Sequence, residues 1–222
     1  QHMTADEKRR VCKLFPNAVI VQHYGLTEAS RSTFLRISDA APAQLGSVGQ
    51  PVGKTQVKCS TDGRIMIRGP HVAQFRVDAD GLHALTDADG WLQTNDLGHF
   101  EDGYLFFDGR ADDLINCGGV KIVPDDIEER LRSQLAPGAQ IAVAKVPDPQ
   151  RGDGILVAVQ TGTYETVQVK DAVLATLKDL GVAVGSALHV MEVDALPVTG
   201  TGKVQRGVLA EMFAAQQASS PT

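Results

Sequence analysis

Asp-Gly pairs recur in the first half of the chain, and three of them restrict how this half can fold. Asp62-Gly63 separates two segments of β-type residues, 57–59 and 64–68. Asp-Gly between two such segments is a strong signal for a β-hairpin, because both residues tolerate positive φ angles. Asp89-Gly90 and Asp102-Gly103 each precede a further segment of apolar and aromatic residues. Repeated hairpins of this kind predict a small barrel or a curled antiparallel sheet.

Beyond Gly109 the pattern changes to mixed helices and strands. Pro124 and the acidic residues after it suit the first turn of a helix, and apolar residues continue at helical spacing to Leu135. Pro137-Gly138 is expected to end this helix and Gly181 the next one. The later helices are predicted at 166–180 and 206–215. Strands are predicted at 141–146, 155–160 and 188–193, and a short buried strand, rich in Val and Ile, at 17–22.

The expected fold class is therefore α+β, with an antiparallel β-barrel-like subdomain followed by a small mixed α+β domain. The boundary between the two falls near 108–113. Residues 1–3 resemble a cloning remnant ahead of a start methionine and are excluded from the fold. The small, polar tail 216–222 is expected to fray.

The composition excludes several classes of protein. The chain has 222 residues and 43% hydrophobic residues, which is ordinary for one large or two small globular domains. A net charge of -6 without a basic cluster argues against nucleic-acid binding. No apolar run approaches the roughly 18–20 residues that span a bilayer. Cys12, Cys59 and Cys117 are far apart in the sequence, which favours reduced thiols and a cytoplasmic protein over disulfides or a zinc site.

The segment 197–206 is the first candidate for chemistry. It places two glycines, two threonines and Lys203 between a predicted strand and a predicted helix. Such a loop offers backbone N–H groups and one cation to an anion. It is not a Walker A loop, because Val204 follows the lysine and Ala195 occupies the first glycine position. By itself, this pattern is more often a surface turn than a site.

Four motifs follow one another along the chain, and together they resemble a known superfamily. Tyr-Gly-x-Thr-Glu matches 24–28, and Thr-Gly-Asp matches 94–96 with Asn95 in place of glycine. Gly-Arg-x-Asp, continuing to Gly-Gly and Pro-x-x-Ile-Glu, matches 109–128; Pro-x-Thr-x-x-Gly-Lys-x-x-Arg matches 197–206. The chain resembles the C-terminal part of the ANL superfamily of adenylate-forming enzymes, which comprises acyl-CoA synthetases, peptide-synthetase adenylation domains and firefly luciferase.

The resemblance implies a two-step reaction and a set of ligands. A carboxylic acid attacks the α-phosphate of ATP, which gives an acyl adenylate and pyrophosphate. A thiol then displaces AMP; it belongs to coenzyme A or to the phosphopantetheine of a carrier protein. The first step brings anionic oxygens together, so that it depends on Mg²⁺ and on well-placed cations.

The resemblance also assigns roles to residues of the nucleotide site. Tyr24 would lie against the adenine, with Gly25 beside it, and Thr27 would contact the α-phosphate. Glu28 would hold Mg²⁺, which prefers oxygen ligands. The remaining contacts to the nucleotide would come from Asp96 and Arg110 at the ribose, and from Lys203, which would bridge the carboxylate and the α-phosphate during adenylation.

The same resemblance divides the chain into two functional parts. Residues 4–109 would be the last, β-rich part of a large N-terminal adenylation domain, and 110–215 would be a mobile C-terminal domain. Asp112 matches the hinge about which that domain rotates between the two half-reactions. Gly118 and Gly119 would line the path of the thiol, where a missing Cβ lets a pantetheine arm pass close to the backbone. These glycines favour a thioester-forming member over luciferase-like chemistry.

Each of these residues also has a purely structural interpretation. Tyr24 could be an aromatic residue at the edge of the core, Glu28 could cap a following helix, and Asp96 could be a turn residue. Arg110 and Asp112 could form a surface ion pair of little energetic value. Gly118 and Gly119 could be only a hairpin turn.

Two departures from the motifs and one missing region restrict the prediction. Asn95 alters a turn next to Asp96, and Asn116 stands where many relatives carry a lysine. The Gly-rich phosphate loop and most of the acyl pocket would lie upstream of Met3. The isolated chain is therefore expected to be inactive or nearly so.

Three interpretations follow. The chain is the C-terminal piece of an acyl-CoA synthetase, a non-catalytic nucleotide-binding subunit that completes a separate N-terminal half, or part of an adenylation module that loads a carrier protein. The first is the preferred hypothesis.

Overall fold

The computed structural model describes residues 3–135, 140–162, 166–200 and 202–219. The chain divides into two compact units between Ala111 and Asp112. This division lies inside the 108–113 segment where the sequence pattern changes. The mixed α+β fold class, with curled antiparallel β structure in the first half, is confirmed.

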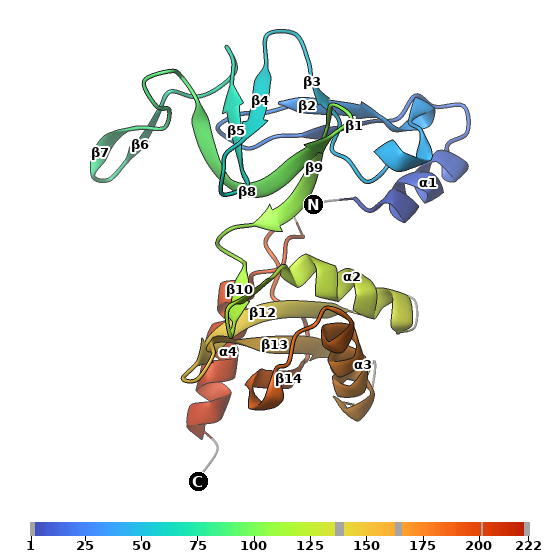
Figure 1. Ribbon diagram of the computed structural model, residues 1–222, viewed down its shortest axis with the longest axis vertical. Coiled ribbons are helices and arrows are strands. Elements are labelled where there is room, and N and C mark those ends of the chain that lie inside the picture. The colour runs from blue at the N-terminus through green and yellow to red at the C-terminus, as the bar shows by residue number, and fades with distance from the viewer. Residues whose placement is uncertain (1–2, 136–139, 163–165, 201, 220–222) are drawn as a thin grey trace. The chain divides into compact units, whose positions relative to one another are not determined.

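Within its described residues, the first unit contains one α-helix and three antiparallel sheets (Figure 1). The helix is α1 (Ala5–Leu14). One sheet has the order β1-β2-β3, formed by β1 (Val21–Tyr24), β2 (Thr33–Arg36) and β3 (Gln50–Pro51). A second sheet has the order β4-β5-β8-β9, formed by β4 (Gln56–Cys59), β5 (Arg64–Arg68), β8 (Leu92–Glu101) and β9 (Tyr104–Arg110). β6 (Phe75–Asp78) and β7 (Gly81–Ala84) form a separate hairpin, and two short 3-10 helices lie at Ile37–Asp39 and Pro42–Gln44.

The predicted hairpins of the first unit are confirmed. β4 and β5 pair in antiparallel register around the Asp62-Gly63 turn, and β8 pairs with β9 around Asp102-Gly103. Asp102 and Gly103 both have positive φ, 48° and 79°, as the tightest hairpin turns require. Leu105 on β9 and Ile65 and Ile67 on β5 are fully buried. The turns therefore bring the apolar side chains of these strands into one core.

The second unit covers both faces of a five-stranded sheet with helices. β12 (Ile141–Asp148) and β13 (Gly152–Gln160) are antiparallel, and β14 (Leu188–Val193) joins β13 in parallel. β10 (Ile115–Cys117) and β11 (Val120–Ile122) form a hairpin that also pairs with β13. The helices are α2 (Pro124–Gln134), α3 (Thr166–Asp179) and α4 (Arg206–Ser219), with a 3-10 turn at Gly185–Ala187.

Alternation along β12 explains how the helices pack. Ile141 and Val143 face a core shared with α2 and α3, whereas Ala142 and Ala144 face a core shared with Leu209 of α4. Because both faces of the strand are covered here, residues 141–144 form a continuous apolar run. The helices and strands predicted at 124–193 are confirmed; α3 ends at Asp179, two residues before Gly181, which has a positive φ of 71°. The expected stop at Pro137-Gly138 lies outside the described residues.

Three expectations about the chain's ends were wrong. The segment 17–22 is not a buried strand: β1 begins at Val21, and Val19 and Val21 are 62% and 49% exposed, because β1 is an edge strand. The tail does not fray from residue 216, since α4 continues to Ser219 through Gln and Ala, which are good helix formers. Met3, which was excluded from the fold, is partly buried and packs against the cluster around Leu35.

Helix α1 was not anticipated, although the sequence carries its signal. Thr4 caps the helix by accepting a hydrogen bond from the Glu7 backbone N–H, and the Glu7 carboxylate accepts one from the Thr4 backbone. This reciprocal arrangement is a capping box, which a Thr-x-x-Glu sequence predicts. Among the residues that the structure describes, no helix combines the length and the apolar character needed to cross a membrane. The three cysteines are free thiols.

Candidate nucleotide-binding site

The loop after β1 is a compact turn that a side chain on Gly25 would disrupt. Leu26 and Ala29 exchange backbone hydrogen bonds of 3.0 and 3.2 Å, and the Ser32 N–H donates to the Tyr24 carbonyl at 2.7 Å. A Cβ on Gly25 would lie 2.4 Å from the Arg31 nitrogen, which is closer than real Cβ contacts. No helix begins after Glu28, so the interpretation of Glu28 as a helix cap is wrong.

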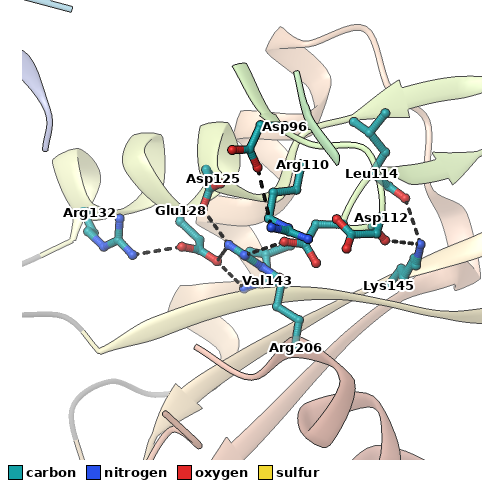
Figure 2. A network of polar contacts seen from close by, with 11 residues as sticks. Asp96, Arg110, Asp112, Leu114, Asp125, Glu128, Arg132, Val143, Lys145 and Arg206 are labelled. Atoms are coloured by element: carbon teal, nitrogen blue, oxygen red, sulfur yellow. Dashed lines mark hydrogen bonds and ion pairs between the residues drawn. The ribbon is translucent and has the colours of Figure 1, made fainter. Parts of the chain in front are cut away.

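Tyr24, Asp96 and Arg110 lie together, although Asp96 is 72 positions from Tyr24 in the sequence. The Tyr24 hydroxyl donates to Asp96 Oδ2 at 2.8 Å. Arg110 is the cross-strand neighbour of Asp96 in β9, and its guanidinium lies 3.5 Å from Asp96 Oδ1 (Figure 2). The interpretation of Asp96 as a turn residue is wrong, because it lies within β8.

Burial separates the roles of these three groups. Asp96 is only 5% exposed, whereas the Arg110 side chain is 41% exposed. Burial, together with the neighbouring Asp96 carboxylate, raises the pKa of Tyr24 well above its ordinary value. Tyr24 therefore stays protonated and donates to the Asp96 carboxylate. A buried carboxylate with a half-exposed cation beside it suits recognition of ligand hydroxyl groups.

The substitution of Asn95 for glycine leaves this arrangement intact. Asn95 lies in β8 and is not among the described residues with positive φ, so a side chain is tolerated without strain. Its side-chain oxygen accepts a hydrogen bond from Arg64 at 2.6 Å. Thr94 accepts from the Asp96 backbone N–H at 3.1 Å and donates to the Ile65 carbonyl at 2.8 Å. The backbone of Asp96 is thereby fixed from the strand next to it.

Thr27 and Glu28 have side chains available to a ligand. Thr27 is exposed and Glu28 is half-buried, and neither side chain has a hydrogen-bond or ion-pair partner among the described residues. In the described part of the chain, no three His, Cys, Asp or Glu side chains are grouped to hold a metal ion. Mg²⁺ bound with phosphates typically takes only one or two carboxylates. The single carboxylate of Glu28 fits that form of coordination.

In the second unit, the backbone of the lysine loop is held in a small hairpin. The Thr199 N–H donates to the Lys203 carbonyl at 2.8 Å, and the Lys203 N–H donates to Thr199 Oγ1 at 3.1 Å. The Gln205 N–H donates to the Pro197 carbonyl at 2.8 Å. The Lys203 side chain is exposed, and its ammonium has no partner among the described residues. Thr201 of the motif lies outside the described residues.

Gly118 and Gly119 form the turn between β10 and β11, so they do lie in a hairpin turn. Their φ angles are 62° and 87°, which explains the need for glycine. A Cβ on Gly119 would have no atom within 4 Å, so the backbone of this residue is open to a ligand. The Asn116 side chain is exposed, and its backbone N–H donates to Asp153 at 2.8 Å.

Arg206 and Glu128, two motif residues to which the resemblance assigns no role, form the centre of a largely buried ionic network. Arg206 donates to Asp125 at 2.6 Å, Glu128 at 2.9 Å and Asp113 at 3.1 Å (Figure 2). Glu128 is 3% exposed and also accepts from the Val143 N–H. Burial alone would lower the pKa of Arg206, but the three carboxylates raise it overall. The sequence signal for this network was the position of Arg206 as the last residue of the lysine motif.

Comparison with known proteins defines the class to which this fold and site belong. No protein-family model matches the chain. A probable CoA ligase of Humulus lupulus is 36% identical over 90% of this chain and 40% of its own length. Oxalate–CoA ligase of Arabidopsis thaliana is 31% identical, over 88% of this chain and 40% of its own length. ATP-bound MatB from Rhodopseudomonas palustris superposes with a TM-score of 0.75 at 27% identity, over 95% of this chain and 43% of MatB.

These matches cover most of the chain and identify its superfamily. The chain belongs to the ANL superfamily of adenylate-forming enzymes and corresponds to the C-terminal portion of its members. It spans about 40% of the length of the curated CoA ligases that it matches.

Proposed function

We propose that this chain is the C-terminal part of an ATP-dependent ligase that joins a carboxylic acid to a thiol. The acid first displaces pyrophosphate from ATP to form an acyl adenylate, and the thiol then displaces AMP. The observation that carries the proposal is the Tyr24–Asp96–Arg110 arrangement, in which a buried carboxylate is held by a protonated phenol and a guanidinium. The match to curated CoA ligases supports coenzyme A as the thiol.

In this proposal, the first unit supplies the adenosine side of the site. Asp96 accepts hydrogen bonds from the ribose hydroxyls, and Arg110 reaches the same sugar from β9. Tyr24 presents a ring beside the adenine, and Gly25 gives the loop its tight turn. Thr27 donates to the α-phosphate, and Glu28 supplies a carboxylate to Mg²⁺, which would neutralise charge on the phosphates.

The second unit supplies the cation for adenylation and the path for the thiol. Lys203 lies on a backbone hairpin that presents its ammonium to solvent, where it can meet the carboxylate and the α-phosphate oxygens. Asp112 is the hinge between residues 4–109 and the mobile domain 110–215. Gly118 and Gly119 line the pantetheine path, which is supported by the open space over Gly119.

A titration with AMP tests the adenosine half of this proposal. The 222-residue chain is expected to bind AMP in a calorimetric titration, and Asp96→Ala to weaken binding about 10–100-fold, since hydrogen bonds to a charged group contribute roughly 1.5–3 kcal/mol. Asp108→Ala is the matched control, because Asp108 lies in the same strand as Arg110 and pairs with the exposed His99. Equal affinity in the wild type and in Asp96→Ala contradicts the proposed site.

An exchange assay tests how far this part can act alone. Because the chain spans about 40% of its relatives, we expect the 222-residue polypeptide to give little ATP–pyrophosphate exchange with a panel of carboxylic acids. Robust exchange would show that the pyrophosphate contacts and the acid pocket are present in this chain. Thioester formation with coenzyme A, compared with a phosphopantetheinylated carrier protein, would then identify the acceptor.

A further inference from the structure

The backbone that follows the boundary between the units is held by an unusual lysine. Lys145 is a charged residue in the apolar part of β12, between the buried residues Ala144 and Val146. Its ammonium donates to the Asp112 carbonyl at 2.6 Å and to the Leu114 carbonyl at 3.4 Å (Figure 2). One side chain of β12 therefore bridges two carbonyls of the segment that leads into β10.

The residue between these two carbonyls is held from a second direction. The Asp113 carboxylate accepts from Arg206 at 3.1 Å, and the Arg206 side chain is only 16% exposed. Arg206 also donates to the Val143 carbonyl of β12 at 2.9 Å. Lys145 and Arg206 thus attach the 112–114 segment to β12 and to the start of α4, and Arg206 lies three positions beyond Lys203.

On the other side of the boundary, the chain is attached to the first unit. The Ala111 N–H donates to the Asn95 carbonyl of β8 at 2.8 Å. Between this hydrogen bond and the Asp112 carbonyl, the backbone retains only the φ and ψ angles of Ala111 and Asp112. Peptide planes are rigid, so a rotation between two anchored planes must be taken up by these angles.

We propose that Lys145 is a positioning residue that confines the hinge to Ala111 and Asp112. The proposal rests on the proposed function, in which the second unit rotates about Asp112. With the Lys145 contacts in place, the 112–114 segment, β12 and the lysine loop move as one body. A rotation at the hinge then reorients Lys203 by the same amount, because the segment between them does not bend. Without the contacts, residues 113 and 114 would also bend, and the orientation of the loop would be less defined.

Nuclear magnetic resonance relaxation on the 222-residue chain tests this role directly. Lys145→Met is expected to lower the backbone order parameters of Asp113 and Leu114 from the rigid value of about 0.85 toward about 0.6, and to leave the rest of the second unit unchanged. Lys121→Met is the matched control, because Lys121 is an exposed strand lysine without a side-chain partner among the described residues. Lys145→Arg, which retains long N–H donors, is expected to restore the order parameters.

Two outcomes overturn the proposal. One is unchanged order at Asp113 and Leu114 in Lys145→Met. The other is a loss of order spread evenly through the second unit, which would mean that Lys145 acts only on stability. The relaxation measurement needs no nucleotide, so the two proposals are tested separately. A negative relaxation result would contradict only the role of Lys145, and a negative AMP titration would contradict only the proposed nucleotide site.

Discussion

The two units hold their candidate functional side chains in opposite ways. In the first unit, Tyr24, Asp96 and Arg110 contact one another, and Asp96 is almost fully buried. In the second unit, the backbone on either side of Lys203 is hydrogen-bonded, whereas its ammonium is exposed and without a partner among the described residues. A surface that recognises a sugar benefits from pre-arranged side chains. A cation that contacts different oxygens in the course of a reaction benefits from a fixed backbone and a mobile ammonium group.

The buried charged groups of the second unit support the backbone of the lysine loop and are separate from the exposed Lys203 ammonium. Arg206 is close to Lys203 in the sequence, yet it is mostly buried and points into the unit. Its guanidinium there pairs with three carboxylates. The comparison therefore predicts that stability in the second unit depends on Arg206, stability in the first depends on the loop at Gly25, and Lys203 contributes to neither.

Replacement of Arg206 should have the largest effect on stability. Arg206→Ala leaves the buried Glu128 with less compensation, and breaking such a buried pair typically costs about 3–5 kcal/mol. The single tryptophan, Trp91, lies in the first unit, so its fluorescence reports the unfolding of that unit. In Arg206→Ala, the urea transition followed by far-ultraviolet circular dichroism should move to lower urea concentration, while the transition followed by Trp91 fluorescence should not move. Arg132→Ala is the control: its side chain is 48% exposed, and it should cost less than about 1 kcal/mol.

A methyl group on Gly25 should have the next largest effect, now confined to the first unit. Gly25→Ala places a Cβ against the Arg31 backbone, and overpacking of this kind costs about 1–3 kcal/mol. Trp91 fluorescence should report the loss. Gly53→Asn tests whether any change of glycine has this effect, since a Cβ there meets no atom within 4 Å and Asn tolerates the positive φ. Equal losses in the two variants would mean that replacing a loop glycine, and not the contact with Arg31, is the cause.

Local patterns predicted the elements of both units better than they predicted the contacts within the site. Asp62-Gly63 and Asp102-Gly103 marked hairpins because turn chemistry is local. The pairing of Tyr24 with Asp96 depends on the register of separate sheets, and only the resemblance to a family brought these residues together. No pattern predicted that Lys145, a charged residue in the apolar part of β12, would reach the carbonyls after the boundary.

Lys8 in the first unit is a buried counterpart to the exposed Lys203, and it provides a pH test. Its ammonium donates to the carbonyls of Leu45 and Ser47, both at 2.7 Å, and burial lowers its pKa from 10.5 to about 8. Between pH 8 and 10.5 the unfolded chain therefore binds more protons than the folded one. Over this range, stability due to Lys8 rises with pH, by at most about 1.4 kcal/mol per pH unit.

The variant Lys8→Met isolates this effect. The difference in free energy of unfolding between wild type and Lys8→Met should be constant below pH 8 and should grow in favour of the wild type above it. Urea unfolding followed by Trp91 fluorescence at several pH values measures the difference, and the titration of Tyr24 cancels because both proteins contain it. A difference that does not change with pH would mean that Lys8 titrates as an ordinary surface lysine.

Replacement of Lys203 should have the smallest effect on stability. Because the ammonium makes no contact among the described residues, Lys203→Ala should change either unfolding transition by less than about 0.5 kcal/mol. Reductive methylation provides a second measurement, in which Lys203 should react as fast as the exposed Lys121 and Lys8 should be protected. A protected Lys203 would mean that its tip is already engaged within the chain. A reactive one would leave the full interaction energy of this cation for a ligand, as a group that acts during a reaction requires.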